Sequence, residues 1–190
     1  MGDSLSAEYG LERGSGWVAR IAEKLKATKY TNAAGNASDR SPLRIENTSI
    51  SGDTTSGGLS RLPAALARFK PRIVIIELGS NDALRGLSLK MVEQNLARMI
   101  ELCREADAQV LLVGMQLPPN YGRAYTEQFR SLYGRLASHY RTALVPFLLE
   151  GMASDRRLFQ EDGIHPNEKA QDILADNVWK ALEPMLKVRG

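Results

Sequence analysis

Three short apolar runs, separated by amphipathic segments, constrain the fold of this chain more than any other feature of its sequence. Residues 72–78 (RIVIIEL), 109–115 (QVLLVGM) and 142–147 (TALVPF) have the length and β-branched content of strands that are buried on both faces. Between and after them, apolar residues recur at helical spacing over about 88–106, 124–139 and 167–186. Strands that alternate with helices in this way predict an α/β fold, with a parallel central sheet and helices on both faces.

The residues before the first of these runs predict further elements. We expect helices over about 14–27 and 57–69, a strand at about 43–48, and an exposed loop over 28–42, where small, turn-forming residues show no periodicity. A length of 190 residues suits one domain with one substantial core, so we expect a single domain over 1–190.

Composition excludes several classes of function. The net charge is +3, with both signs interspersed, which gives no argument for nucleic-acid binding. No stretch approaches the roughly 18 apolar residues of a membrane span, so no stable membrane insertion is expected. One cysteine and two histidines leave little material for a metal centre. We interpret the cysteine, Cys103, as a small residue on a helix face.

Two polar segments carry the residue types that nucleophilic catalysis needs. Ser4 follows Gly2-Asp3 in a turn that we expect at the start of a helix, where its hydroxyl would be exposed. Asp162 and His165 are spaced so that the carboxylate can orient an imidazole whose other nitrogen faces a hydroxyl. Taken singly, both segments have commoner interpretations, as a turn or as the capped start of a helix.

Two further residues could supply oxyanion donors. Gly52 lies in a turn where its backbone N–H could point at an oxyanion, although an ordinary left-handed glycine is the commoner interpretation. Asn81 directly follows a predicted strand, and its amide could donate, although it could equally form an Asx-turn. Right-handed crossovers place strand-to-helix loops at one edge of a parallel sheet, so all four segments are expected at one rim.

Together these segments resemble a known family. Gly2-Asp3-Ser4-Leu5, the Gly52 turn, Gly79-Ser80-Asn81-Asp82 and Asp162-Gly163-Ile164-His165 resemble the four blocks of the SGNH (GDSL) hydrolases. ISGDTTSGGLSRLPAAL, IVIIELGSNDALRG, VLLVGMQLPPNYG, ALVPFLLEG and DGIHPN are similar to its bacterial multifunctional arylesterase/thioesterase/lysophospholipase branch. The resemblance covers nearly all of residues 2–187 and implies a three-layer, flavodoxin-like sandwich.

The resemblance also implies roles for individual residues. Ser4 would attack the acyl carbonyl, His165 would carry the proton, and Asp162 would orient His165. The backbone N–H groups of Ser4 and Gly52 and the amide of Asn81 would form the oxyanion hole. A loop would border the acyl site, formed by Leu117, Pro118, Pro119, Asn120 and Tyr121. No metal and no organic cofactor is implied.

The implied substrates are small aryl or alkyl esters, acyl thioesters or lysophospholipids, and a monomer or dimer is expected. One alternative is a carbohydrate or peptidoglycan O-acetyl esterase, against which the LPPNYG loop argues. The other is an inactive binding protein, against which the intact Ser4, Asp162 and His165 set argues and for which a missing first strand would argue. Asp3 and Asp82 are interpreted as carboxylates that brace loops, and His139 as facing solvent.

The sequence departs from the family at its start. The family has a buried strand before Gly-Asp-Ser, whereas only Met1 precedes Gly2 here, so the first strand is expected to be truncated. Met1 could be an internal residue of that strand, another segment or a partner chain could supply the strand, or the chain could be a cut variant. The chain as given carries no targeting segment, which predicts a cytoplasmic location, or a periplasmic or secreted one if a leader was lost. Glu8 stands where the family motif often has glycine.

Overall fold

The computed structural model describes residues 1–27 and 43–186. Within them, β1 (Ile73–Ile76), β2 (Gln109–Val113) and β3 (Ala143–Val145) form a parallel sheet in the order β1-β2-β3. Ile73 of β1 lies opposite Gln109, and Leu111 of β2 lies opposite Ala143. The three central strands predicted from the apolar runs are therefore confirmed, each a little shorter than its run.

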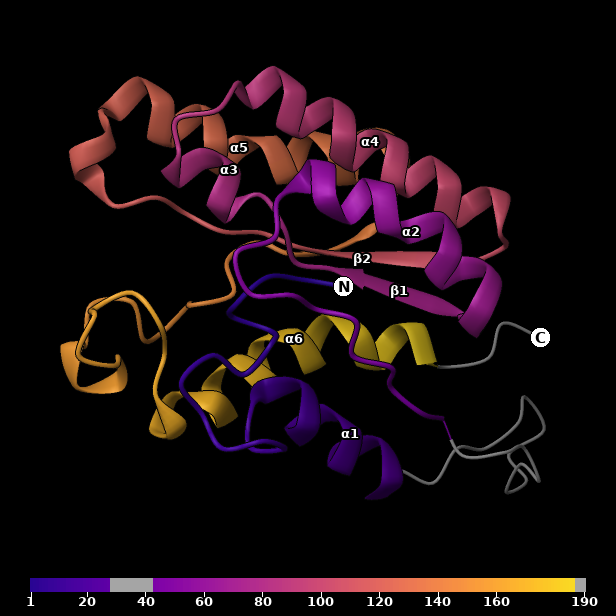
Figure 1. Ribbon diagram of the computed structural model, residues 1–190, viewed down its shortest axis with the longest axis horizontal. Coiled ribbons are helices and arrows are strands. Elements are labelled where there is room, and N and C mark those ends of the chain that lie inside the picture. The colour runs from indigo at the N-terminus through magenta and orange to yellow at the C-terminus, as the bar shows by residue number, and fades with distance from the viewer. Residues whose placement is uncertain (28–42, 187–190) are drawn as a thin grey trace.

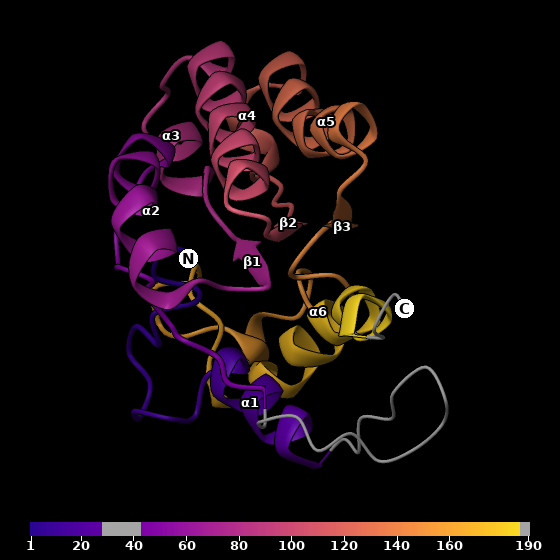
Figure 2. The same cartoon turned by 90° about the vertical axis from the view of Figure 1, so that its right-hand side faces the viewer.

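Helices cover both faces of this sheet (Figures 1 and 2). One face carries α2 (Thr55–Phe69), α4 (Leu89–Glu105) and α5 (Arg123–Tyr140), and the other carries α1 (Trp17–Ala27) and α6 (Gln171–Leu186). Short helical segments connect them: α3 (Ser80–Leu84) and the 3-10 turns η1 (Pro119–Tyr121), η2 (Arg156–Leu158) and η3 (Glu168–Ala170). The predicted three-layer α/β architecture is confirmed, with small shifts at the helix ends.

Burial on both faces explains why β2 lies in the middle of the sheet. Leu111 and Leu112 point to opposite faces, and both are fully buried. On one side, α4 presents Val92, Leu96 and Met99, all fully buried, at helical spacing. Cys103 continues this buried stripe, so its prediction as a packing residue is confirmed.

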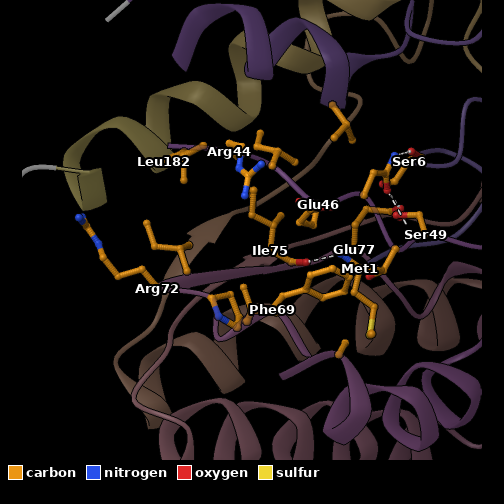
Figure 3. Close-up of a pocket in the computed structure, with 18 of the residues that line it drawn as sticks. Met1, Ser6, Arg44, Glu46, Ser49, Phe69, Arg72, Ile75, Glu77 and Leu182 are labelled. Carbon is orange, nitrogen blue, oxygen red and sulfur yellow. Dashed lines mark hydrogen bonds between the residues drawn. The ribbon is translucent and has the colours of Figure 1, made fainter. Parts of the chain in front are cut away.

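The predicted strand at 43–48 is wrong. Residues 43–50 form neither helix nor strand. A strand is stabilised by a ladder of hydrogen bonds to a neighbour, whereas a cavity of about 230 Å³ is lined by residues of this segment and of β1 (Figure 3). The segment therefore has strand-like composition, but it has no partner strand in the part of the chain that the structure describes. The loop predicted over 28–42 lies outside the described residues.

The expectation that Ser4 begins a helix is also wrong. Residues 3–10 form successive turns, in which the N–H of Ala7 donates to the carbonyl of Asp3 over 2.9 Å. Glu8 has a φ of 61°, a left-handed conformation that favours glycine and interrupts a helix. Its carboxylate accepts from the N–H groups of Gly14 and Gly16, both at 2.9 Å, which offsets that strain.

A buried polar cluster lies beneath these turns, formed by Met1, Asp3, Ser6 and Glu77. Glu77 Oε2 accepts from the Ser6 hydroxyl over 2.7 Å and from the Asp3 N–H over 3.2 Å. Gly2 is required here, because a Cβ on it would lie 2.7 Å from the same oxygen. Burial raises the pKa of Glu77 well above its usual range, and burial raises the pKa of Asp3 to about 6.

The cluster predicts a pH dependence of stability for Glu77→Gln. The pKa of Glu77 is raised in the folded state, so wild type loses stability as pH rises above the ordinary value of 4.5. A glutamine keeps an acceptor oxygen but cannot ionise. The variant should therefore gain in free energy of unfolding relative to wild type between about pH 4 and about pH 7, measured by urea denaturation.

The matched control is Asp172→Asn, at a side chain that is 77% exposed on α6 and pairs with Arg20. Its difference from wild type should stay nearly flat over the same range, since exposed ion pairs contribute little. If the difference in free energy of unfolding between Glu77→Gln and wild type is equally flat, folding does not disfavour ionisation of Glu77, and its pKa is the same in the folded and unfolded protein.

Candidate active site

The structure brings Ser4, His165 and Asp162 into one hydrogen-bonded chain. His165 Nε2 lies 2.9 Å from Ser4 Oγ, although the two residues are 161 positions apart. His165 Nδ1 lies 2.6 Å from Asp162 Oδ2. An imidazole held between a hydroxyl and a carboxylate in this way can take the hydroxyl proton while the carboxylate stabilises the resulting cation.

The backbone around Asp162 fixes its carboxylate. Asp162 Oδ1 accepts from the N–H of Ile164 over 2.9 Å and from the N–H of His165 over 3.0 Å. Partial burial pushes the pKa of Asp162 up, but these N–H groups and the His165 ring outweigh it and lower the pKa to about 2. Asp162 is therefore ionised at any pH near neutrality, and its second oxygen is free to hold the imidazole.

Sequence reasoning missed one neighbour of His165. The ring of Tyr9 packs on the His165 ring, with 4.4 Å between the centroids and 37° between the planes. Gln160 joins the two segments, because its Nε2 donates to the Tyr9 carbonyl over 2.8 Å and its N–H donates to the His165 carbonyl over 2.8 Å. No pattern in the sequence links Tyr9 to His165, since their contact exists only once the two loops are folded together.

Asn81 lies in the first turn of α3 and joins two other loops. Its Nδ2 donates to Asp3 Oδ2 and to the Asp53 carbonyl, both at 3.0 Å. The other carboxylate oxygen of Asp3 accepts from the Leu5 N–H over 3.0 Å. Asp3 thus holds both the turn that carries Ser4 and the Asn81 amide, as the interpretation of a bracing carboxylate expected.

Gly52 lies in a turn next to the Ser4 loop. The turn has a φ of 79° at Gly52, which favours glycine, and the neighbouring Ile50 N–H donates to the Gly2 carbonyl over 3.0 Å. Arg85 Nη2 holds the Gly52 carbonyl over 3.1 Å. Asp53, the next residue, bonds Asn81 through its carbonyl, so Gly52 and Asn81 are fixed relative to one another.

Asp82 connects the same region to the start of α2. Its carboxylate accepts from the Thr55 N–H over 2.8 Å and from the Thr55 hydroxyl over 2.7 Å, at the start of α2. Asp82 and Thr55 are both fully buried. The prediction that Asp82 braces a loop agrees with these contacts.

The segment from Leu117 to Tyr121 follows β2 at the same edge of the sheet, on the left of Figure 1. Leu117 packs against the core, whereas Pro118, Pro119, Asn120 and Tyr121 are exposed. The helix that follows is anchored near Asn81, because the Tyr125 hydroxyl donates to the Leu87 carbonyl over 2.9 Å. The segment thus lies on the expected edge, with its polar and aromatic side chains free.

Two other candidates lie outside this site. Burial raises the pKa of the Cys103 thiol to about 12, so it is no nucleophile near neutral pH. His139 is exposed near the end of α5, as predicted.

In residues 1–27 and 43–186 no group of three or more His, Cys, Asp or Glu side chains could hold a metal ion. No helix in that part of the chain is long and apolar enough to cross a membrane.

The chain is similar to known proteins over nearly its whole length. The chain is 48% identical over 186 residues to esterase TesA of Pseudomonas aeruginosa, covering 98% of this chain and 87% of that protein. It is 39% identical to thioesterase 1/protease 1/lysophospholipase L1 of Escherichia coli, covering 98% of this chain and 83% of that protein. The crystal structure of TesA matches with a TM-score of 0.88, covering 97% of this chain and 96% of that one.

A family model gives the same result. The model of the GDSL-like lipase/acylhydrolase family matches residues 1–173, which hold all four blocks. With this match and relatives at 39–48% identity, the chain belongs to the GDSL-like lipase/acylhydrolase family of hydrolases.

Proposed function

We propose that this protein is a serine esterase that hydrolyses carboxylic esters and acyl thioesters through an acyl-enzyme intermediate. The single observation that carries the proposal is the chain of contacts from Ser4 Oγ to His165 Nε2 and from His165 Nδ1 to Asp162. Relatives named as an esterase and as a thioesterase and lysophospholipase support the same chemistry. The substrates are small molecules, and protein groups and water are sufficient for the reaction.

The first step forms the acyl-enzyme. His165 Nε2 takes the Ser4 proton as Ser4 Oγ bonds to the acyl carbon, and the carbonyl oxygen becomes an oxyanion. Asp162, ionised because its pKa is about 2, stabilises the imidazolium. The oxyanion then reforms the carbonyl, the bond to the alcohol or thiol breaks, and His165 gives its proton to that leaving group.

The second step returns the enzyme. Water gives a proton to His165 Nε2 as its oxygen bonds to the acyl carbon, and the bond to Ser4 Oγ breaks. His165 then returns the proton to Ser4, and a carboxylic acid leaves. The same two residues therefore carry the proton in both steps.

The oxyanion hole is assigned to the backbone N–H groups of Ser4 and Gly52 and to the Asn81 amide. Their loops are already joined, since Asn81 Nδ2 donates to both Asp3 and Asp53. Asn81 must then share one of these N–H groups with the oxyanion. Donors that are fixed before the reaction need no reorganisation when charge develops, which is the source of their effect on rate.

Exposed apolar side chains around the site suit an apolar acyl group. Tyr9 packs on His165, Ile164 precedes it, and Ile50 lies in the Gly52 turn; all three are about half exposed or more. Large apolar side chains in contact with water are favourable places for an alkyl or aryl group to bind. The segment from Leu117 to Tyr121 adds a further exposed aromatic ring at the same edge, so we assign it to the acyl-binding side.

Ser4→Ala tests the nucleophile. The variant should lose hydrolysis of a short-chain p-nitrophenyl ester by at least about 10³-fold, because no hydroxyl remains to form the acyl-enzyme. Its thermal midpoint should stay close to that of wild type. Ser138→Ala, at an exposed position on α5, is the matched control and should keep full activity. Turnover that survives in Ser4→Ala would assign the nucleophile elsewhere.

Asn81→Ala tests the oxyanion donor. It should lower kcat by about 10²–10³-fold and change KM little, since the contact strengthens only in the transition state. Asn177→Ala is the matched control, because the Asn177 amide likewise donates two hydrogen bonds, here to two backbone carbonyls at 3.0 and 2.9 Å, but on α6. That variant should lose stability and keep kcat. A change in Asn81→Ala that is confined to KM would contradict the role.

A further inference from the structure

The segment that carries His165 has little support from regular secondary structure. Residues 160–165 form neither helix nor strand, and residues 161–164 are exposed. The Asp162 side chain is 36% exposed and the His165 side chain is 19% exposed. The proposed reaction nevertheless needs His165 within hydrogen-bond distance of Ser4 and Asp162 at the same time. Contacts from other segments must therefore hold the imidazole ring in place.

The two hydrogen bonds of the His165 ring both lie at its edge. Nδ1 lies 2.6 Å from Asp162 Oδ2, and Nε2 lies 2.9 Å from Ser4 Oγ. The faces of an imidazole ring carry no hydrogen-bonding atom, so only packing can hold the ring against tilting out of this plane. The Tyr9 ring covers one face, with 4.4 Å between the centroids and 37° between the planes. Tyr9 thus supplies a contact that the two edge bonds cannot.

The backbone of Tyr9 lies between the loops of the nucleophile and of the base. Its N–H donates to the Ser4 carbonyl over 3.3 Å. Its carbonyl accepts from Gln160 Nε2 over 2.8 Å, and the Gln160 N–H donates to the His165 carbonyl over 2.8 Å. Tyr9 is therefore bonded on one side to the Ser4 turn and on the other to the His165 segment. Its ring cannot move far from the imidazole unless these bonds break.

The residues on either side of Tyr9 restrict its backbone further. Glu8 has a φ of 61° and Gly10 a φ of 69°, so both lie in the left-handed region. The Glu8 carboxylate accepts from two glycine N–H groups just before α1, both at 2.9 Å. A Cβ on Gly10 would lie 2.1 Å from Gln160 Oε1, so the Tyr9 turn and the His165 segment are in close contact. The position of the Tyr9 ring is thus fixed by α1 as well as by the site.

The Tyr9 ring also faces the group on which positive charge develops. In both steps of the proposed reaction His165 takes up a proton and becomes an imidazolium. The face of a tyrosine ring is electronegative and attracts a cation within about 6 Å of its centroid, and the His165 ring lies inside that distance. The contact therefore favours the imidazolium over the neutral imidazole, and it does so through the ring face and not through the phenol hydroxyl.

We propose that Tyr9 is a positioning residue for His165, whose ring holds the imidazole between Ser4 and Asp162 and stabilises it while it carries the proton. The effect on rate rests on the proposed esterase function, whereas the hold on the ring does not. Because the ring face acts, Tyr9→Phe should behave as wild type and Tyr9→Leu should not. Tyr9 is 51% exposed, so neither change should prevent folding.

Turnover of a short-chain p-nitrophenyl ester tests the effect on rate. Tyr9→Leu should lower kcat by roughly 5- to 50-fold, and Tyr9→Phe should restore it to within about twofold of wild type. Leucine keeps an apolar side chain beside the site, so KM should change little. The matched control is Tyr140→Leu, because the Tyr140 ring packs on the other histidine, His139, with 4.7 Å between the centroids. That variant should keep kcat.

Nuclear magnetic resonance of the 15N-histidine-labelled protein without substrate tests the hold on the ring. The chain has two histidines, and the exposed His139 serves as the internal reference. The proton between His165 Nδ1 and Asp162 exchanges with water only when the ring leaves the carboxylate. Its exchange should be at least about tenfold faster in Tyr9→Leu than in wild type, and unchanged in Tyr9→Phe.

Two results would overturn the proposal. Tyr9→Leu that matches wild type in proton exchange would show that the ring does not hold His165. An equal loss of kcat in Tyr9→Phe and Tyr9→Leu would show that the hydroxyl, and not the ring face, is what matters. If wild type itself does not hydrolyse the ester, the esterase proposal fails, and the exchange measurement alone then decides whether Tyr9 positions His165.

Discussion

Parallel pairing of β1 with β2 and of β2 with β3 determines where the segments of the candidate active site lie. Parallel strands end at the same edge, so the segments that follow β1 and β2 emerge side by side, although they are remote in sequence. Asn81 follows β1, the Leu117–Tyr121 segment follows β2, and the loop to His165 follows β3. Ser4 reaches the same edge because Gly2 pairs with Glu77, at the end of β1.

Hydrogen bonds between these segments then fix the positions of the segments and of their side chains. Asp3, Asn81 and Asp53 tie three segments together, and each bond uses a short side chain next to a turn. Gln160 and Tyr9 perform the same task on the side of His165. Turns alone would leave these side chains free to rotate, whereas the shared contacts leave each with few alternatives.

The polar cluster under Ser4 shows how closely the site and the sheet edge are coupled. Glu77 lies at the end of β1, supports the turn that carries Ser4, and also lines the cavity beside the Met1 amino group. One oxygen of its carboxylate, Oε1, is buried without a hydrogen-bond partner among the described residues. An unpaired buried oxygen costs free energy, so the turn of Ser4 is held by a carboxyl group whose burial is only partly compensated by hydrogen bonds.

Apolar periodicity records burial directly, so the α/β class, the three central strands and the long helices α1, α2, α4, α5 and α6 could be predicted from the sequence, whereas α3 and the 3-10 turns could not. The sequence also indicated Ser4, Gly52, Asn81, Asp162 and His165, because their blocks hold residue types of specific chemistry at specific spacing. Features that depend on contacts between remote segments could be seen only in the folded chain. The packing of Tyr9 on His165 needs two folded loops, and the turn after Ser4 depends on the left-handed Glu8. Residues 43–48 form no ladder because no strand within residues 1–27 and 43–186 lies beside them. Strand composition is a local property, whereas a strand exists only when a neighbour satisfies its backbone groups.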